Sequence, residues 1–510
     1  MGKLFSISVI VIVTISLRLY NINGNSFWLD EVYSTWFAKK SLNYIWTIGP
    51  SFEVHPPLYY TLLHVWILLG DSETTLRLLS VLISVLTVPL VYGLGRTIGG
   101  ANRGHLIGLL ASTLFAVSSL QIRFAQEARS YAFLAAAVTV VLLGAAWIMR
   151  NPDRAAVPIL ARSPDGGRLA WAAVAFGGAT TLWLHNIGVL YMSSILGVLL
   201  TWCMILYKTH KHLLYNAIIV LSIIALIWLP WIPHILFQMR LVTSGFWIAT
   251  PDYKIVFGTA VTLFGFESIP SIIHAPILIG IYGLYAMGRR YGWPVASLFM
   301  SALLMPLLLA LAVSLMAAPI FLPRTLTASS VPYYVLLSIG FIDMRLPFLK
   351  KTIAVFMPVL LIFNTVDYFR DDSKEPWREI AENIISKSVS EKDESNIVLA
   401  VPNFAAIPLQ YYFDRKNYNV SVIPLPSEFP DFNTVRAYVA MPGASEIHET
   451  DLKLVADLVR DRKEVWLVTR KRDWHDPDGI VENWLRARLD QTYAQNFQLI
   501  EVFHFVMDTP

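Results

Sequence analysis

The sequence predicts a polytopic α-helical membrane protein that ends in a soluble α/β domain. Of its 510 residues 55% are hydrophobic and only 15% are charged, and the mean hydropathy is +0.54. Apolar runs without charge recur from residue 4 to about residue 363, whereas the chain from Tyr368 onward is rich in charge and has no spanning run. A water-soluble fold of this size could not cover so much apolar surface.

Eleven transmembrane helices are expected. The first apolar run has no small-residue cleavage site, so it predicts a membrane span and not a cleaved signal peptide. The run at 58–70 is shorter than the roughly 17 residues that a span needs, and it predicts an interfacial or re-entrant helix. The spans are then expected at 4–20, 77–95, 105–121, 131–149, 169–184, 187–207, 213–232, 270–287, 294–313, 325–342 and 352–367.

The distribution of Lys and Arg predicts the orientation. With a cytoplasmic amino terminus, the short cytoplasmic turns hold thirteen basic residues and the longer outer segments hold eight. Cytoplasmic loops carry an excess of Lys and Arg, so this orientation is favoured over its reverse. We therefore expect a multi-pass plasma-membrane protein with a membrane domain at 1–367. The first outer loop (21–76), the segments 121–130 and 233–269, and a domain at 368–510 would lie on the extracytoplasmic side.

The charged tail predicts a small α/β domain. Segments typical of strands alternate with segments typical of helices, which favours a mainly parallel sheet. The tail has no glycine-rich phosphate loop, so we expect a domain for recognition or support. The strands are expected at 397–401, 420–424, 465–469 and 499–506, and the helices at 377–388, 451–462 and 480–493.

Composition and motifs argue against several classes of function. The single cysteine, Cys203, lies in an apolar run, which excludes an intramolecular disulfide framework and a cysteine metal site. A net charge of +4 spread over the loops argues against nucleic acid as a partner. There is no HExxH motif and no DxD motif near the candidate site, so no cofactor is predicted and a divalent metal has no motif to support it.

The strongest candidate for catalysis is the acidic pair Asp30–Glu31 in the aromatic stretch SFWLDEVYSTW. Consecutive helical residues point about 100° apart, so one acid can face a substrate while the other braces it. Partial dehydration is expected to raise the carboxylate pKa toward the range of a general base. The alternative is a pair of solvated loop carboxylates, which the aromatic neighbours make less favourable.

Two further motifs are candidates. The rigid turn His55-Pro56-Pro57 starts the interfacial helix, and His55 is either part of a rigid loop or a substrate contact. In the segment QIRFAQEARSY at 121–131, a helix would place Arg123, Glu127 and Tyr131 on one face and point Arg129 largely away. Charges at this depth usually serve a site, although a surface Arg123–Glu127 ion pair is the alternative.

Several polar residues lie at the outer ends of apolar runs. They could hold a lipid-linked phosphate through paired hydrogen bonds, or they could hold ordinary lipid headgroups. These residues are Arg77, His185, Asn186, Arg240, Lys254 and Arg324.

The order of the motifs resembles that of the protein O-mannosyltransferase-like membrane glycosyltransferases, a family that includes the transferase of aminoarabinose to lipid A. The motifs are SFWLDEVYS, HPPLYYTLLHVW, TLRLLSVLISVLTVPLVYGLGR and RFAQEARSYAF, within about residues 15–145. A looser similarity continues through WLPWIPHILFQMR, SGFW and LPRTL and leaves the tail poorly covered.

The resemblance implies a GT-C fold and an inverting transfer of a monosaccharide from a polyprenyl-phosphate donor to a lipid, glycan or protein acceptor at the outer face of the membrane. It implies that Asp30 is the catalytic base, with Glu31 beside it. Arginines would stabilise the departing phosphate. Relatives vary in the type and position of the acid that corresponds to Glu127, so the role of Glu127 stays open. The expected substrate or phosphate contacts are His55, Arg77, Arg123, Glu127, Arg129, Tyr131 and Arg324.

Two other functions compete with this one. A transporter or flippase of lipid-linked sugars commonly shows internal repeats and polar residues at the bilayer midplane. Here no repeat is visible and the charges crowd the outer ends of the spans, which favours the transferase. A polymer ligase would use the same lipid pool and would differ in its donor, a long glycan in place of one sugar.

Overall fold

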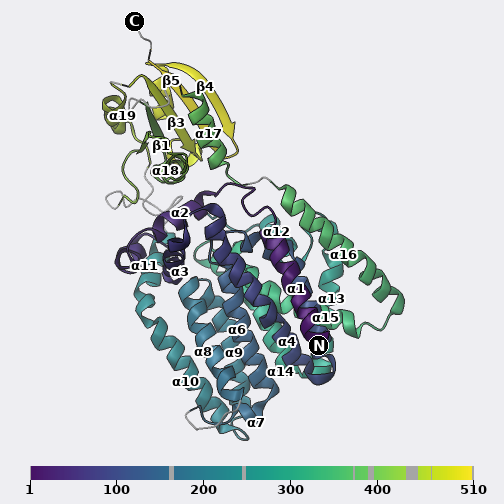
Figure 1. Ribbon diagram of the computed structural model, residues 1–510. Helices are drawn as coiled ribbons and strands as arrows, with labels where there is room; N and C mark the ends of the chain where they lie inside the picture. The colour runs from purple at the N-terminus through teal and green to yellow at the C-terminus, as the bar shows by residue number, and fades with distance from the viewer. Residues whose placement is uncertain are drawn as a thin grey trace.

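A computed structural model of the chain describes residues 2–159, 166–243, 248–371, 374–388, 396–431, 446–460 and 462–507. Arg162, one of the basic residues counted for the orientation, and the SGFW motif at 244–247 lie outside these ranges. Figure 1 shows a bundle of long helices that carries the C-terminal domain on one of its ends. The two parts differ in composition as the sequence predicts.

Each of the eleven predicted spans overlaps a helix over most of its length, and two of them share α4. This helix reverses at Gly100, whose φ of 62° lies in the left-handed region that favours glycine, and its two arms pack where Gly95 meets Gly108. The helices are α1 (Gly2–Leu19), α4 (Glu73–Val117), α6 (Tyr131–Arg150), α8 (Gly166–Leu184), α9 (Gly188–Ile205), α10 (Lys211–Trp228), α13 (His274–Tyr291), α14 (Trp293–Met316), α15 (Ser330–Asp343) and α16 (Pro347–Arg370).

Eight helical stretches within the described ranges are long and apolar enough to cross a membrane. The chain is therefore a polytopic α-helical membrane protein, as the sequence predicts. The number of crossings, eleven, stays a prediction. The apolar run at 58–70 forms only the short helix α3 (Leu58–Trp66) and one further turn, which fits an interfacial position.

The predicted cytoplasmic turns and the predicted outer segments lie at opposite ends of the bundle. At one end, Asp343 forms ion pairs with Arg103 and Arg290, and Arg150 donates to the carbonyl oxygen of Tyr291. These residues come from four separate turns of the predicted cytoplasmic face. The predicted outer segments meet at the opposite end, below the C-terminal domain (Figure 1). Which end faces the cytoplasm stays a prediction.

The membrane domain also contains short helices, which were only partly predicted. The segment 233–269 is largely helical, because α11 (Ile232–Thr243) continues the bundle and α12 (Tyr253–Phe264) follows it. The remaining helices of the membrane domain are α2 (Leu29–Ala38), α5 (Ser119–Ala125) and α7 (Pro152–Ala155).

The sheet of the C-terminal domain is mixed, so the prediction of a mainly parallel sheet is wrong. Its order is β2-β1-β3-β5-β4, in which β1 pairs in parallel with β2 and β3, and β5 pairs antiparallel with β3 and β4. The second half of the helix predicted at 480–493 is the start of β4. The strands are β1 (Asn396–Val401), β2 (Ser421–Pro424), β3 (Glu464–Arg470), β4 (Asp490–Phe497) and β5 (Ile500–Val506).

Side-chain alternation along the central strands builds two cores in this domain. Ile397 and Leu399 face α19 (Leu452–Val459) and α21 (Ile480–Arg486), whereas Val398 and Ala400 face the opposite layer. That second layer contains α17 (Trp377–Lys387), α18 (Ala406–Arg415) and also aromatic residues of the first outer loop. A short helix, α20 (Arg472–His475), follows β3.

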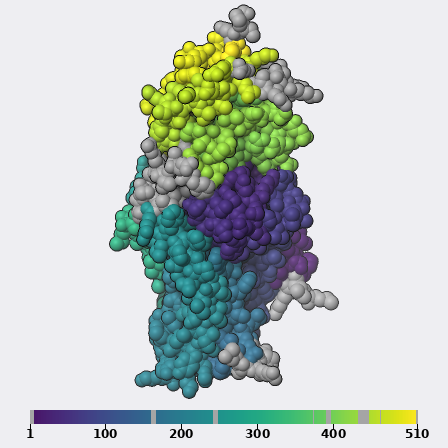
Figure 2. Space-filling view, turned by 90° about the vertical axis from the view of Figure 1, so that its left-hand side faces the viewer, coloured from purple at the N-terminus to yellow at the C-terminus, as the bar shows by residue number. Residues whose placement is uncertain are grey.

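The first outer loop therefore lies between the two parts of the molecule. Phe27 and Phe37 of the loop share one hydrophobic cluster with Trp377 and Phe413 of the C-terminal domain. Figure 2 shows the loop as a purple band between the blue and teal bundle and the green and yellow domain. Burial of these aromatic rings fixes the loop on both sides.

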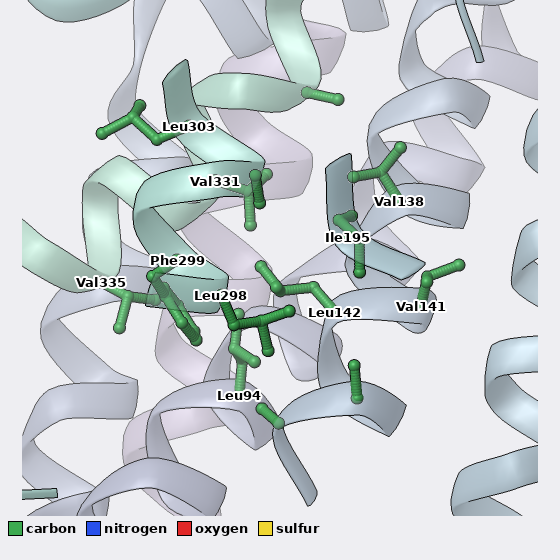
Figure 3. Packing of buried hydrophobic residues seen from close by; sticks show 14 of the residues in the cluster. Leu94, Val138, Val141, Leu142, Ile195, Leu298, Phe299, Leu303, Val331 and Val335 are labelled. Atoms are coloured by element: carbon green, nitrogen blue, oxygen red, sulfur yellow. The ribbon is translucent and has the colours of Figure 1, made fainter. Parts of the chain in front are cut away.

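The bundle core is packed by hydrophobic side chains from several helices. Figure 3 shows Leu94, Leu142, Ile195, Phe299 and Val335, which come from five different helices and belong to one buried cluster. Small residues bring other helices closer still. A Cβ added to Gly283 of α13 would lie 1.9 Å from the carbonyl oxygen of Leu336 in α15.

This contact predicts the effect of one added methyl group. Gly283→Ala would force α13 and α15 apart, because the atom that it meets is backbone, and should destabilise the protein by about 1–3 kcal/mol. Gly197→Ala is the matched control: its Cβ would meet nothing within 4 Å, and alanine favours a helix by up to about 1 kcal/mol. Thermal unfolding in detergent should give a lower midpoint for the first variant only. Equal midpoints would contradict the close packing.

Candidate active site

A cavity of about 1050 Å³ lies between the outer end of the bundle and the C-terminal domain. It opens among segments that are far apart in the sequence: the first outer loop, the α5–α6 turn, the segment before α15, and the turns that follow β3 and β4. Its charged and imidazole lining residues are Asp30, Glu53, His55, Arg123, Glu127, Arg129, His185, Arg324, Asp371, Lys374, Glu375, Arg470 and Lys471.

The two acids of the predicted pair occupy the first turn of α2, where negative charge is stabilised by the helix dipole. They point in different directions, as the helical spacing predicts. Glu31 is fully buried, whereas the Asp30 side chain is 25% exposed and lines the cavity. Only Asp30 can therefore meet a substrate directly.

Glu31 forms the central ion pair of the loop. Its carboxylate accepts two hydrogen bonds from the buried Arg77, from Nε and Nη2, each at 2.8 Å, and a third from the backbone N–H of Ala128 at 2.9 Å. The other donors of Arg77 bind the carbonyl oxygens of Ile22, Asn25 and Ser26. Glu31 thus ties α2 to the start of α4 and to the α5–α6 turn.

The prediction that Arg77 contacts a donor phosphate needs correction. Arg77 is 1% exposed and does not line the cavity, because the ion pair and three carbonyl oxygens use its guanidinium group. It is a structural residue that holds the loop. Glu31 is likewise a bracing residue and not a group of the cavity.

Asp30 lies between two arginines of the cavity. Its Oδ2 is 3.5 Å from Nη1 of Arg324 and 3.9 Å from Nη2 of Arg129. Burial would raise the pKa of Asp30, but the positive charges of Arg129 and Arg324 outweigh burial and hold this pKa below its usual value. The expectation of a raised pKa is wrong for this residue, and Asp30 is ionised at neutral pH.

The segment 121–131 does not form one helical face. Helix α5 ends at Ala125 and a turn separates it from α6, so the predicted alignment of Arg123, Glu127 and Tyr131 and the alternative Arg123–Glu127 pair are both wrong. Arg123 pairs with Glu267 at 3.0 Å, and Glu127 lies 3.5 Å from Lys374.

The turn also reverses the prediction for Arg129, which points into the site. Its Nη1 donates to Ser34 Oγ at 3.0 Å, and its guanidinium group lies 5.9 Å from the centre of the Tyr131 ring. The pKa of Glu127, which lies in the same turn, is raised. Burial raises it, and the positive charge of Lys374 offsets the effect of burial only in part.

Histidines line another side of the cavity. His55 Nδ1 lies 2.5 Å from Oε1 of Glu53, and the ring of His55 meets the ring of His185 edge to face, with centres 4.6 Å apart. Glu53 precedes the HPP turn by two residues but was not singled out, because a lone acid in a loop carries no pattern. The structure gives it a defined role in orienting His55.

The remaining residues predicted at the outer ends of spans divide into two groups. Asn186 lines the cavity and also binds the carbonyl oxygen of Val54 and the indole N–H of Trp231. Arg240 and Lys254 are exposed and do not line the cavity, so the structure does not bring them to the site.

The sequence reasoning missed the contribution of the tail. Arg470 at the end of β3, and Lys471 and Trp474 just after it, line the cavity. Lys374 reaches Glu31 and Glu127 from the connection to the C-terminal domain. No local signal could have found these residues, because the fold brings them to a cavity whose other walls come from distant parts of the sequence; Lys374, for example, meets Glu31 and Glu127 across more than two hundred positions. Within the described ranges, no group of three or more His, Cys, Asp or Glu side chains could hold a metal ion.

Comparisons with known proteins concern the family and the fold of the chain. The family model of dolichyl-phosphate-mannose-protein mannosyltransferases matches residues 54–154, which include the HPP turn and the α5–α6 turn. No curated protein sequence matches the chain. The folds of several solved membrane proteins, in contrast, match nearly its whole length.

Two of these structures are of ArnT from Cupriavidus metallidurans. The apo form has a TM-score of 0.64 at 12% identity, covering 99% of this chain and 98% of ArnT. The form bound to undecaprenyl phosphate has a TM-score of 0.59 at 13% identity, covering 98% and 97%. The Archaeoglobus fulgidus oligosaccharyltransferase AglB, in complex with an inhibitory peptide and a dolichol-phosphate, has a TM-score of 0.56 at 13% identity, covering 96% and 73%. The chain therefore has the GT-C fold that the resemblance implies.

The different surroundings of the two acids predict different losses of stability. Glu31→Gln would leave the buried Arg77 without its counter-charge and should cost about 3–5 kcal/mol. Asp30→Asn removes a partly exposed carboxylate whose nearest ion-pair distance is 3.5 Å, and should cost about 1 kcal/mol or less. Thermal unfolding of both variants in detergent checks the difference. A Glu31→Gln protein as stable as wild type would remove the ion pair from its structural role.

Proposed function

We propose that the chain is an inverting membrane glycosyltransferase that moves one sugar from a polyprenyl-phosphate donor to a lipid, glycan or protein acceptor. The reaction would take place on the extracytoplasmic face of the plasma membrane. The observation that carries the proposal is Asp30, an ionised carboxylate that lines a cavity with several cationic side chains. Its support is the fold shared with ArnT bound to undecaprenyl phosphate and with AglB in complex with a dolichol-phosphate.

In the proposed reaction Asp30 is the general base. The acceptor oxygen or nitrogen attacks the anomeric carbon of the donor sugar from the side opposite the phosphate, and Asp30 takes the acceptor's proton. As the new glycosidic bond forms, the bond between the anomeric carbon and the phosphate oxygen breaks. The electron pair of that bond leaves with the polyprenyl phosphate. Asp30 then returns its proton to water.

The cations of the cavity suit the leaving group. Negative charge grows on the phosphate oxygen as the bond breaks, and fixed positive groups stabilise that charge better than reorienting water does. Arg324 lies beside Asp30, with its guanidinium group 5.2 Å from the centre of the Trp28 ring, and Arg123 and Lys374 line the neighbouring wall. These three side chains are the proposed phosphate contacts, and the step needs no cofactor.

The C-terminal domain has a proposed role in recognition of the acceptor. Lys471 directly follows β3 and Trp474 belongs to α20, and Lys471 Nζ lies 3.9 Å from the centre of the Trp474 ring. An aromatic face can stack on a sugar ring, and a cation can meet an anionic group. Both side chains lie on the roof of the cavity, opposite the membrane.

Removal of the proposed base should abolish turnover. Asp30→Asn should lower the release of polyprenyl phosphate by about 10²–10⁴-fold while the protein stays folded, because the amide cannot take a proton. Asp457→Asn, at an exposed acid of α19 that pairs with Arg460, is the matched control and should keep full activity. The assay uses purified protein in liposomes with a panel of polyprenyl-phosphate monosaccharides and membrane extract.

The outcomes of this assay separate the competing functions. The labelled product of wild type would identify the sugar and the acceptor. Equal release by wild type and Asp30→Asn would exclude Asp30 as the base. If no donor is consumed but the lipid-linked sugar crosses the liposome membrane, the flippase function would replace the transferase.

The depressed pKa of Asp30 predicts the pH dependence. The carboxylate must be ionised to act, so activity should persist below the usual carboxyl pKa of about 3.9 and fall only at lower pH. Arg324→Gln removes a charge that lowers this pKa, so the acidic limb of the kcat/KM profile should move to higher pH. Arg324→Lys keeps the charge and should leave the limb near its wild-type position. An acidic limb that is the same in all three proteins would show that another group titrates.

A further inference from the structure

His185 occupies the turn between α8 and α9. It lines the cavity, although the residue is only 8% exposed. The mechanism above does not use it. Its ring lies edge to face against His55, and more loosely against Tyr131, whose ring centre is 6.4 Å away. These neighbours fix the plane of the imidazole.

One hydrogen bond determines where the His185 ring carries its proton. The backbone N–H of Ile187 donates to Nδ1 of His185 at 3.2 Å, so Nδ1 must hold a lone pair. Burial, together with the charges of His55, Arg129 and Arg324, lowers the pKa of His185 well below its usual value, so the ring is neutral at physiological pH. A neutral ring with an unprotonated Nδ1 carries its hydrogen on Nε2.

That Nε2–H group is a buried donor without an acceptor. Among the described residues, Nε2 of His185 has no hydrogen-bond partner. Buried polar groups are nearly always hydrogen-bonded, and an unpaired one in a native structure needs an explanation. In a residue that lines a cavity, the simplest explanation is a ligand atom that accepts the bond.

His55 lies next to this donor. The Glu53 carboxylate accepts from the backbone N–H of His55 at 2.8 Å and lies 2.5 Å from its Nδ1, so Nδ1 of His55 carries a hydrogen and the ring of His55 is held in place. The oxygen of a hydroxyl group can accept from the Nε2–H of His185, and its own hydrogen can be donated to another group of the cavity.

Other ligand groups fit this place less well. An ammonium group has only donors and would face the N–H of His185. A phosphate has only acceptors when ionised, and the cavity offers it arginine and lysine side chains with full charge. Asp30, His55 and His185 line the same cavity, and the charges of Arg129 and Arg324 act on both Asp30 and His185. A sugar held at Asp30 would present its hydroxyl groups there.

We propose that His185, through Nε2–H and with His55 beside it, binds a hydroxyl group of the sugar that is transferred and selects donors that carry this hydroxyl. The inference rests on the proposed function, because it assigns the sugar-binding part of the same site. His185 is thereby a specificity residue and not a phosphate contact.

Two substitutions separate the two sides of the His185 ring. In His185→Asn the amide oxygen can replace Nδ1 and still accept from the N–H of Ile187, but nothing reaches the position of Nε2. In His185→Gln the amide N–H can reach the position of Nε2, so the donor toward the sugar is kept. Both variants preserve a polar side chain, and their folding is checked by the same thermal unfolding as above.

The donor used is the undecaprenyl-phosphate monosaccharide that wild type turns over fastest, together with its monodeoxy analogues. For wild type, one analogue should lose about 10- to 100-fold in kcat/KM, the effect of leaving one buried donor unpaired. His185→Asn should be slower by a similar factor on the parent donor and should no longer discriminate against that analogue. His185→Gln should recover much of the discrimination. Equal penalties in wild type and His185→Asn would overturn the inference and leave the proposed function intact.

A second measurement does not depend on turnover. In protein labelled with ¹⁵N at histidine, the signal lost in His185→Asn should be that of a neutral ring with hydrogen on Nε2 at neutral pH. Adding the undecaprenyl-phosphate sugar should shift this signal, whereas bare undecaprenyl phosphate should not. A protonated ring, hydrogen on Nδ1, or an equal shift with both lipids would overturn the inference. Failure of the proposed function would instead appear as the absence of polyprenyl phosphate release from every donor.

Discussion

The buried ion pair between Glu31 and Arg77 is the constraint on which the site depends. Moving two charges out of water costs several kcal/mol per ion, and the pair repays this only because its geometry is bidentate and its remaining donors and acceptors are used. The carbonyl oxygens that Arg77 binds belong to the first outer loop, and the N–H that Glu31 binds belongs to the α5–α6 turn. One pair therefore positions three segments, and two of them carry cavity residues.

The same loop also holds the C-terminal domain. Glu375 accepts from Arg470 at 2.6 Å and from the backbone N–H of Leu29 at 3.2 Å, so it links β3 to the start of α2. Glu73, at the start of α4, binds Arg378 and Tyr412 of the domain. Since Leu29 directly precedes Asp30, the roof of the cavity and the proposed base share one support. A shift of the domain would move both.

Hydropathy, charge and local motifs predicted the helical bundle, the segments that meet at its outer end and the pair Asp30–Glu31, because each of these depends on residues near in sequence. Three features could not be found in this way. The helix break after Ala125 places Arg129 beside Asp30, the antiparallel half of the sheet needs the pairing of β5 with β3, and Lys374 and Arg470 arrive from the tail. All three depend on long-range contacts. The low pKa of Asp30 follows from the same cause, since its arginine neighbours come from distant segments.

That low pKa bears on how the proposed reaction could be driven. A carboxylate held between Arg129 and Arg324 is a weak base when the cavity is empty of substrate. A donor phosphate near Arg324 would bring negative charge toward Asp30 and offset the effect of the arginine, so the pKa of Asp30 would rise when the donor binds. The base would then be stronger in the complex that needs it, and the same arginine would stabilise the phosphate as it departs. In this arrangement, one of the two charges that depress the pKa of the free site, that of Arg324, would also stabilise the leaving group.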